Sequence, residues 1–171
     1  MKKDVLLVDG YNVIGAWPEL QELKKDDLAQ ARDRLIERMA EFQATKGWRV
    51  IIVFDAHLVP GIEKRKKQYR VEVVFTRENE TADERIEKLV SELSNRLTQI
   101  HVATSDLVEQ WVVFAQGALR ISARELEIAM KEVDYLIARK VRNSREERPL
   151  SKIPLSEEVA KAFEKMRRGE Q

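Results

Sequence analysis

The sequence predicts an α/β fold, an open and mostly parallel β-sheet with helices on both faces. Apolar runs at residues 4–9 and 48–54 are short and rich in β-branched residues, as strands buried inside a parallel sheet are. Stretches in which apolar residues recur at helical spacing separate these runs from later strand candidates. Such alternation of strands and helices implies βαβ crossovers, which place helices on both faces of one sheet.

Glycines bound the elements of the first half of the chain. Gly10 breaks the first apolar run, and Gly47 follows a stretch with helical spacing of its apolar residues. The run that ends at Thr76 has the composition of a third strand. The expected elements are a strand at 4–9, a loop at 10–18, a helix at 27–46, a strand at 48–54 and a strand at 71–76.

Two capping boxes mark helix starts in the second half. Thr81 and Ser122 are each followed three residues later by a glutamate, Glu84 and Glu125 respectively. The first of these helices is expected to bury Ile86, Leu89, Val90, Leu93 and Leu97. The other expected elements are a strand at 100–104, a short helix from 105 to 116, a strand at 118–121, a helix through 137, an arm at 142–154 and a final helix that begins at Ser156.

Length and hydropathy indicate a single soluble domain with an extension. The chain has 171 residues, and a domain typically takes roughly 100–200. We expect residues 1–142 to form the domain, and residues 143–171 to form an arm and a short helix packed on or beside it. No apolar run approaches the ~20 residues that a membrane helix needs. We therefore expect a cytoplasmic protein without membrane contact, with a monomer as the favoured state.

Composition limits the chemistry. The chain has no cysteine and two histidines, which excludes a disulfide scaffold, a cysteine nucleophile and a zinc site of Cys or multiple His ligands. The 31 Lys and Arg residues balance 30 Asp and Glu residues, so overall charge does not indicate a nucleic-acid partner. Neither a phosphate-binding loop nor a Gly-x-Gly-x-x-Gly motif is present, which disfavours nucleotide hydrolysis by a P-loop and Rossmann dehydrogenase chemistry. We expect no small-molecule cofactor. Any bound metal must have oxygen ligands.

Four aspartates follow predicted strands or open the next helix. Asp9, Asp55 and Asp106 come at strand ends, and Asp83 lies in the first turn after Thr81. Because ligands of open α/β sheets bind beyond the carboxyl ends of the strands, we expect all four carboxylates at one edge. Such a cluster repels itself unless a cation neutralises it, and Mg²⁺ or Mn²⁺ prefers oxygen ligands. A metal held there activates water and stabilises charge on a phosphodiester.

A structural alternative remains open at each of these positions. Aspartate after a strand is a common turn former and helix cap, and Asp83 also suits the positive end of a helix. An aspartyl-phosphate mechanism of the Asp-x-Asp type is disfavoured, since Tyr11 stands where the second aspartate belongs.

The acidic motifs resemble those of a known family. Residues 8–14, Val-Asp-Gly-Tyr-Asn-Val-Ile, resemble the opening signature of the NYN domain, a branch of the PIN-like nuclease superfamily. The segments at 53–55, 80–83 and 103–106 resemble its later acidic motifs, in the same order. The likeness covers residues 3 to about 142, and the ending resembles the YacP-type subgroup of ribosome-dependent mRNA endonucleases.

The resemblance implies a fold and a set of roles. The family fold is a parallel sheet flanked by helices. Asp9, Asp83 and Asp106 would be catalytic carboxylates that bind Mg²⁺ or Mn²⁺, with Asp55 as a nearby acidic member. Asn12 would orient a ligand or the scissile phosphate, and Ser105 would be an auxiliary group. Members of the YacP-type subgroup cut mRNA at the ribosomal decoding site, which would make mRNA and the ribosome the partners.

Two basic runs are candidates for RNA contact. Phosphate neutralisation dominates nucleic-acid affinity, and an aromatic ring stacks on unpaired bases. The second run, at 139–152, includes Arg142 and Arg145. The first run follows the Asp55 loop, which suggests that it lies near the catalytic edge. Its residues are Lys64, Arg65, Lys66, Lys67, Tyr69 and Arg70. A solvated surface without a ligand is the alternative for both.

The sequence thus predicts a metal-dependent endoribonuclease. Two other functions stay open. A non-catalytic RNA-binding or ribosome-binding module would keep the fold, although the full acidic set argues against a decayed site. A metal-dependent phosphatase or nucleotidase would use the same edge on a small substrate, and the basic runs favour a polymer over it.

Overall fold

The computed structural model describes residues 2–58, 66–68, 70–106, 114–147 and 157–169. The chain divides into two compact units, Met1–Tyr135 and Leu136–Gln171. The first contains the whole sheet. In the second, the described residues form the end of one helix and a further helix. Within the described part of the chain, every helix is too short or too polar to span a membrane.

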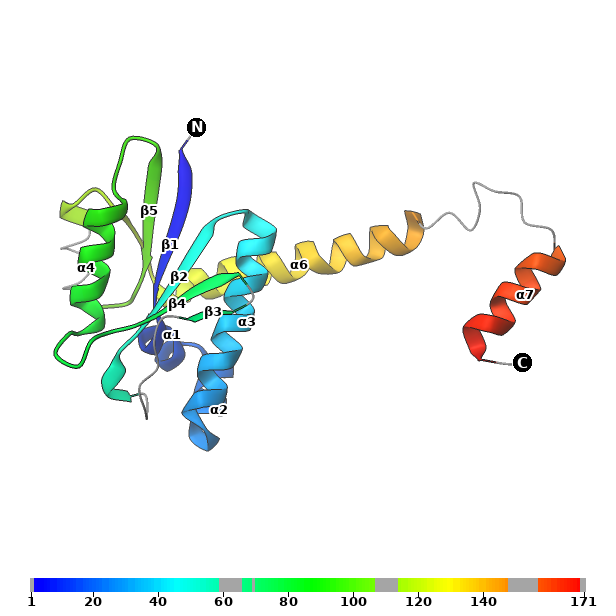
Figure 1. The fold of residues 1–171 in the computed structure, drawn as a ribbon, viewed down its shortest axis with the longest axis horizontal. Helices are drawn as coiled ribbons and strands as arrows, with labels where there is room; N and C mark the ends of the chain where they lie inside the picture. Colours follow the sequence, from blue (N-terminus) through cyan, green and yellow to red (C-terminus); the bar gives the residue numbers. More distant parts are fainter. Residues whose placement is uncertain (1, 59–65, 69, 107–113, 148–156, 170–171) are drawn as a thin grey trace. The chain divides into compact units, whose positions relative to one another are not determined.

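The first unit is built on a six-stranded sheet whose order is β3-β4-β2-β1-β5-β6. Figure 1 labels β1 to β5 of this sheet. Every neighbouring pair is parallel except β3 and β4, which are antiparallel. The predicted open, mostly parallel sheet is therefore confirmed. The strands are β1 (Lys3–Asp9), β2 (Arg49–Phe54), β3 (Lys66–Gln68), β4 (Val71–Phe75), β5 (Thr98–Ala103) and β6 (Leu119–Ile121).

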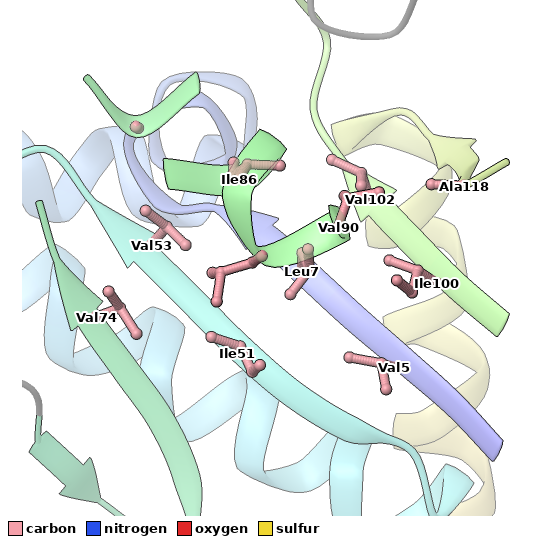
Figure 2. Close-up of a cluster of buried hydrophobic side chains, with 12 residues drawn as sticks. Val5, Leu7, Ile51, Val53, Val74, Ile86, Val90, Ile100, Val102 and Ala118 are labelled. Carbon is pink, nitrogen blue, oxygen red and sulfur yellow. The ribbon is translucent and has the colours of Figure 1, made fainter. Parts of the chain in front are cut away.

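Helices cover both faces of this sheet, as predicted. Side chains alternate between the two faces along a strand. Leu7, Val53 and Val102 belong to a buried cluster that includes Ile86 and Val90 of helix α4 (Figure 2). Helices α1 and α3 lie against the opposite face, where Leu6 and Val8 of β1 and Ile52 of β2 are equally buried. The helices are α1 (Gly10–Ala16), α2 (Pro18–Asp26), α3 (Leu28–Lys46), α4 (Ala82–Leu93), α6 (Ala123–Glu147) and α7 (Glu157–Arg168), with a 3₁₀ turn η1 (Ala56–Leu58).

Capping groups explain why the predicted helices begin and end where they do. Asp27 accepts a hydrogen bond from the Ala29 amide at the start of α3, and Gly47 ends that helix with a φ of 72°. Thr81 caps α4 by accepting from the amide of Glu84. Ser122 and Glu125 form the reciprocal bonds of a capping box at the start of α6.

The prediction of a loop at residues 10–18 is wrong. β1 passes directly into α1, and Pro18 at the first position of α2 follows a single extended residue, Trp17. A Cβ at Gly10 would overlap the ring of Phe54, so the glycine serves close packing there. Trp17 is buried, and its indole N–H donates to the carbonyl of Ala123 at 2.7 Å.

Three further expectations need correction. Leu97 is 68% exposed because α4 ends at Leu93 and the chain turns at Asn95, whose side chain accepts from the Leu97 amide. The arm expected from Arg142 is helical at first, since α6 continues to Glu147. β3 was not predicted, because a run of cations hid a three-residue edge strand. Of the short helix expected from 105 to 116, residues 107–113 lie outside the described residues, as does the cap Ser156 of the last helix.

Candidate functional site

The strand order marks a switch point at the centre of the sheet. From β1 the chain passes to β2 and β4 on one side, and then returns to β5 and β6 on the other. Ligands of open α/β sheets bind where such a reversal occurs, outside the carboxyl ends of the two strands concerned. Those strands are β1 and β5, which end at Asp9 and Ala103.

A buried hydroxyl links the ends of these two strands. Thr104, directly after β5, is fully buried, and its Oγ1 donates to Oδ2 of Asp9 at 3.3 Å. The same Oγ1 accepts from the backbone amide of Asp106 at 3.1 Å. Asp9 is 8% exposed, and Asp106 is half-buried. Thr104 therefore holds the Asp9 carboxylate and the backbone of Asp106 together at the switch point.

Asn12 and Ser105 join the same network. The Ser105 amide donates to Oδ1 of Asn12 at 2.7 Å, which ties the first helix to the loop after β5. The Ser105 hydroxyl accepts from the amide of Ala123, the first residue of α6, at 3.2 Å. The side chains of Asp9 and Asn12, with Ser105 and Asp106, thus lie around one loop. All four are among the site residues that the sequence predicts.

Asp55 lies one strand away, at the end of β2. Its Oδ1 accepts from the His57 amide at 3.0 Å, which closes a turn. The hydroxyl of Thr76, after the neighbouring β4, accepts from the Ala56 amide at 2.9 Å. Asp55 thus performs the turn-forming role that the structural alternative describes, and its carboxylate stays half-buried at the carboxyl edge of the sheet.

Asp83 lies half-buried in the first turn of α4, where the helix dipole favours a carboxylate. Near it in sequence, Glu80 is 4% exposed and accepts from Arg85 at 2.8 Å and Lys88 at 2.6 Å. Burial acts to raise the pKa of Glu80, but hydrogen bonds from Lys88, the Arg77 amide and Arg85 outweigh it and keep the pKa below its ordinary value. Glu80 is therefore a neutralised anchor of this loop.

The positions of the acidic residues decide how a metal ion could be bound. Across the part of the chain that the structure describes, no three Asp, Glu or His side chains gather closely enough to enclose a metal. The structure brings the Asp9 carboxylate and the Asp106 backbone to one hydroxyl, and leaves Asp55 and Asp83 at the ends of other elements. Mg²⁺ commonly uses one or two carboxylates and completes its shell with water and substrate phosphate. The pair at the switch point fits that mode, and the metal assignment itself stays a prediction.

The predicted RNA-binding residues are dispersed. Lys64, Arg65 and Tyr69 lie outside the described residues. Lys66 and Lys67 lie on β3, which runs antiparallel to β4 at the edge of the sheet. The run therefore leads away from the carboxyl edge, and Arg70 precedes the first residue of β4 at the amino edge. There its carbonyl accepts from the side chain of Gln43. The expectation that the whole run lies near the catalytic edge is wrong for Arg70.

The second basic run starts on a helix. Arg142 and Arg145 are exposed residues of α6 in the second unit. The extended arm that the sequence predicts from residue 142 is therefore helical at both positions. Their role in RNA binding stays a prediction.

Sequence reasoning missed two residues of this region. Thr104 stands within the motif at 103–106, where no sequence pattern marks its hydroxyl. Arg32 is 9% exposed on α3, where it interrupts the apolar face, and its Nη1 donates to the Tyr11 hydroxyl at 3.2 Å. The Tyr11 ring packs on Phe54 with centroids 5.1 Å apart. The sequence signal for Arg32 is a cation on the face of the helix that otherwise carries Leu28, Ala31, Leu35 and Ile36.

Known proteins share both this sequence and this fold. The sequence model of the family described as the YacP-like NYN domain matches residues 6–168. YacP of Bacillus subtilis (strain 168) is 61% identical over 167 residues, which cover 98% of each chain. The crystal structure of Rae1 (YacP) from Bacillus subtilis matches with a TM-score of 0.77 at 61% identity, covering 97% of this chain and 95% of that one. A mutant of Rae1 matches with a TM-score of 0.75 at 57% identity, covering 97% and 96%. The resemblance drawn from the acidic motifs is confirmed.

Proposed function

The chain belongs to the YacP-like NYN family, which has a nuclease fold, and from that premise we propose that it is a metal-dependent endoribonuclease. It hydrolyses phosphodiester bonds in mRNA, and it does so on the translating ribosome. The ribosome is proposed from the family resemblance of the sequence motifs.

One observation carries the enzymatic part of the proposal: Asp9 and Asp106 meet at the Thr104 hydroxyl at the switch point of the sheet. A buried hydroxyl that binds the Asp9 carboxylate and the backbone amide of Asp106 fixes the end of β1 relative to the loop after β5. Such preorganisation matters because a reacting group displaced by an ångström loses much of its rate advantage.

Each residue of the site has a task in this proposal. Asp9 and Asp106 would hold a Mg²⁺ or Mn²⁺ ion, and Asp83 and Asp55 would add negative charge from the same edge of the sheet. When bound there, such an ion would lower the pKa of a coordinated water and stabilise charge on the phosphodiester. Asn12 keeps the loop after β5 in place through the Ser105 amide, and its NH₂ group is suited to orient a phosphate.

A specific observation favours a second candidate, a non-catalytic RNA-binding module. Among the described residues no third acidic or histidine side chain joins Asp9 and Asp106. Two carboxylates alone would leave most of the metal shell to water and substrate phosphate. If these ligands do not hold a metal, the protein would bind RNA without cutting it.

The deciding experiment compares wild type with Asp9→Asn on translating and on free mRNA, followed by mapping of the 5′ ends of the fragments. We expect Mg²⁺-dependent or Mn²⁺-dependent cuts by the wild type on translated mRNA, and none by the variant. Binding of ribosomes or RNA without any cuts would favour the non-catalytic module. Hydrolysis of small phosphate esters in preference to RNA would favour a phosphatase.

A further inference from the structure

Helix α3 buries two arginines that differ in their partners. Arg32 and Arg38 are each 9% exposed. Arg38 donates to both carboxylate oxygens of Asp134, at 2.6 and 2.8 Å, and also pairs with Glu41. For Arg32, the only polar contact among the described residues is the neutral hydroxyl of Tyr11. The same helix therefore buries one cation that is paired with carboxylates and one that has no carboxylate partner among the described residues.

Burying a cation without an anion is costly. A buried charge normally has a partner of opposite sign, because attraction to that partner offsets the free energy cost of removing the charge from water. Arg38 follows that rule: its hydrogen bond to Asp134 raises the pKa of the guanidinium and lowers that of the carboxyl. Arg32 departs from it, so its guanidinium has donors available for an anion that is not part of the described chain.

The position of Arg32 indicates which anion this is. α3 ends just before β2 begins, so its first turns lie toward the carboxyl edge of the sheet. The Tyr11 hydroxyl that contacts Arg32 belongs to a residue two positions after Asp9, and the Tyr11 ring packs on Phe54, the residue before Asp55. Arg32 thus lies one side chain away from the acidic loops, on the side of β2.

We propose that Arg32 binds a phosphate of the RNA strand next to the scissile one, with the Tyr11 hydroxyl setting the orientation of its guanidinium. The proposal rests on the function proposed above. A planar guanidinium donates two parallel hydrogen bonds to a phosphate, which a lysine ammonium cannot reproduce. An RNA strand that enters along this side therefore meets a fixed cation before it reaches the acidic pair.

Binding of a fluorescent single-stranded oligoribonucleotide tests the proposal without requiring cleavage. All proteins carry Asp9→Asn, so that RNA stays intact, and affinity is measured across a salt series. We expect Arg32→Met to weaken affinity about 10- to 100-fold and to lower the magnitude of the log–log salt slope by about 0.7, the value for one phosphate contact. Arg32→Lys should retain the slope and lose part of the affinity. Arg38→Met, at a temperature where it is folded, should bind like the parent.

Thermal unfolding separates a ligand-binding role from a structural one. Methionine fills the space of the Arg32 stem without its charge, so Arg32→Met should unfold at the parental temperature or above it, whereas Arg38→Met should unfold lower. The proposal is overturned if Arg32→Met binds RNA as the parent does, or if the parent binds no RNA. It is also overturned if Arg32→Met loses affinity only in proportion to its loss of folded protein. A wild type that binds RNA through Arg32 without cutting it would refute the nuclease function and leave this proposal standing.

Discussion

Replacing Thr104 by valine removes the hydroxyl that links Asp9 to Asp106 and keeps the shape of the side chain. The lost bonds are the 3.3 Å bond to the Asp9 carboxylate and the 3.1 Å bond from the Asp106 amide. With each bond contributing about 1 kcal/mol, the variant should lose about 2 kcal/mol of stability. For a chain of this size that lowers Tm by about 4–8 °C.

Activity should fall further than stability. Without the shared hydroxyl, the Asp9 carboxylate and the backbone of Asp106 lose their common anchor. Misplacement of a reacting group by an ångström costs about 100-fold in rate. The assay is metal-dependent cleavage of mRNA by folded protein, measured together with thermal unfolding. We expect the kcat of Thr104→Val to be at least about 100-fold lower than that of the wild type.

Thr104→Ser is the matched control, because it keeps the hydroxyl and removes one methyl group. It should lose about 1 kcal/mol of stability and retain most of the activity. If Thr104→Val cleaves as fast as Thr104→Ser, the hydroxyl does not organise the site, and the assignment of the switch point as the catalytic centre is refuted.

Three other predictions address charge. Asp9→Asn, Asp83→Asn and Asp106→Asn should each abolish cleavage, and full activity in any two would contradict the site. The metal-free Asp9→Asn and Asp106→Asn proteins should unfold at the wild-type temperature or higher because carboxylate repulsion is relieved. Asp83→Asn should unfold at or slightly below that temperature, because the first turn of α4 loses a favourable charge. Neutralising the cations of residues 64–67 should lower the magnitude of the slope of log RNA affinity against log salt concentration by about 2–3. The affinity for Mn²⁺ should stay unchanged. If Mn²⁺ affinity falls and RNA binding does not, the run supports the metal site and does not bind RNA. The pKa of Glu80 is lowered in the folded protein, so its ionised carboxylate should stabilise the fold at pH values above the ordinary glutamate pKa of about 4.3. This stabilisation should be lost as pH falls through the lowered pKa. The free energy of unfolding of Glu80→Gln should therefore depend less on pH in that acidic range.

The sheet could be predicted because burial on both faces leaves a clear signal. β1 and β2 are continuous apolar runs, and each helix start that a capping box marked is present. α1 escaped prediction because it is seven residues long, begins with Gly10 and includes Gly15. Intrinsic preference disfavours such a helix, and packing decides instead: Val13 and Ile14 are buried, and Gly10 admits the ring of Phe54.

The candidate site was predictable in its residues but not in its geometry. Asp9 and Asp106 follow strands, which indicates one edge of the sheet. Their adjacency depends on β5 pairing directly with β1, a long-range choice that no local pattern records. Asp55 follows a strand too, yet the order of strands places β2 on the other side of β1 from β5. The four carboxylates expected together are therefore spread along the edge.

The start of α6 supports the site from outside the acidic motifs. The amide of Ala123 donates to the hydroxyl of Ser105, and the carbonyl of Ala123 accepts from the indole of Trp17 at the end of the first helix. Asn12 of that helix returns to the Ser105 amide. This closed circuit of hydrogen bonds joins α1, the loop after β5 and the first turn of α6. The capping box at Ser122 fixes where that turn begins, so a motif that the sequence marks only as a helix start also determines the position of the loop that carries Asp106.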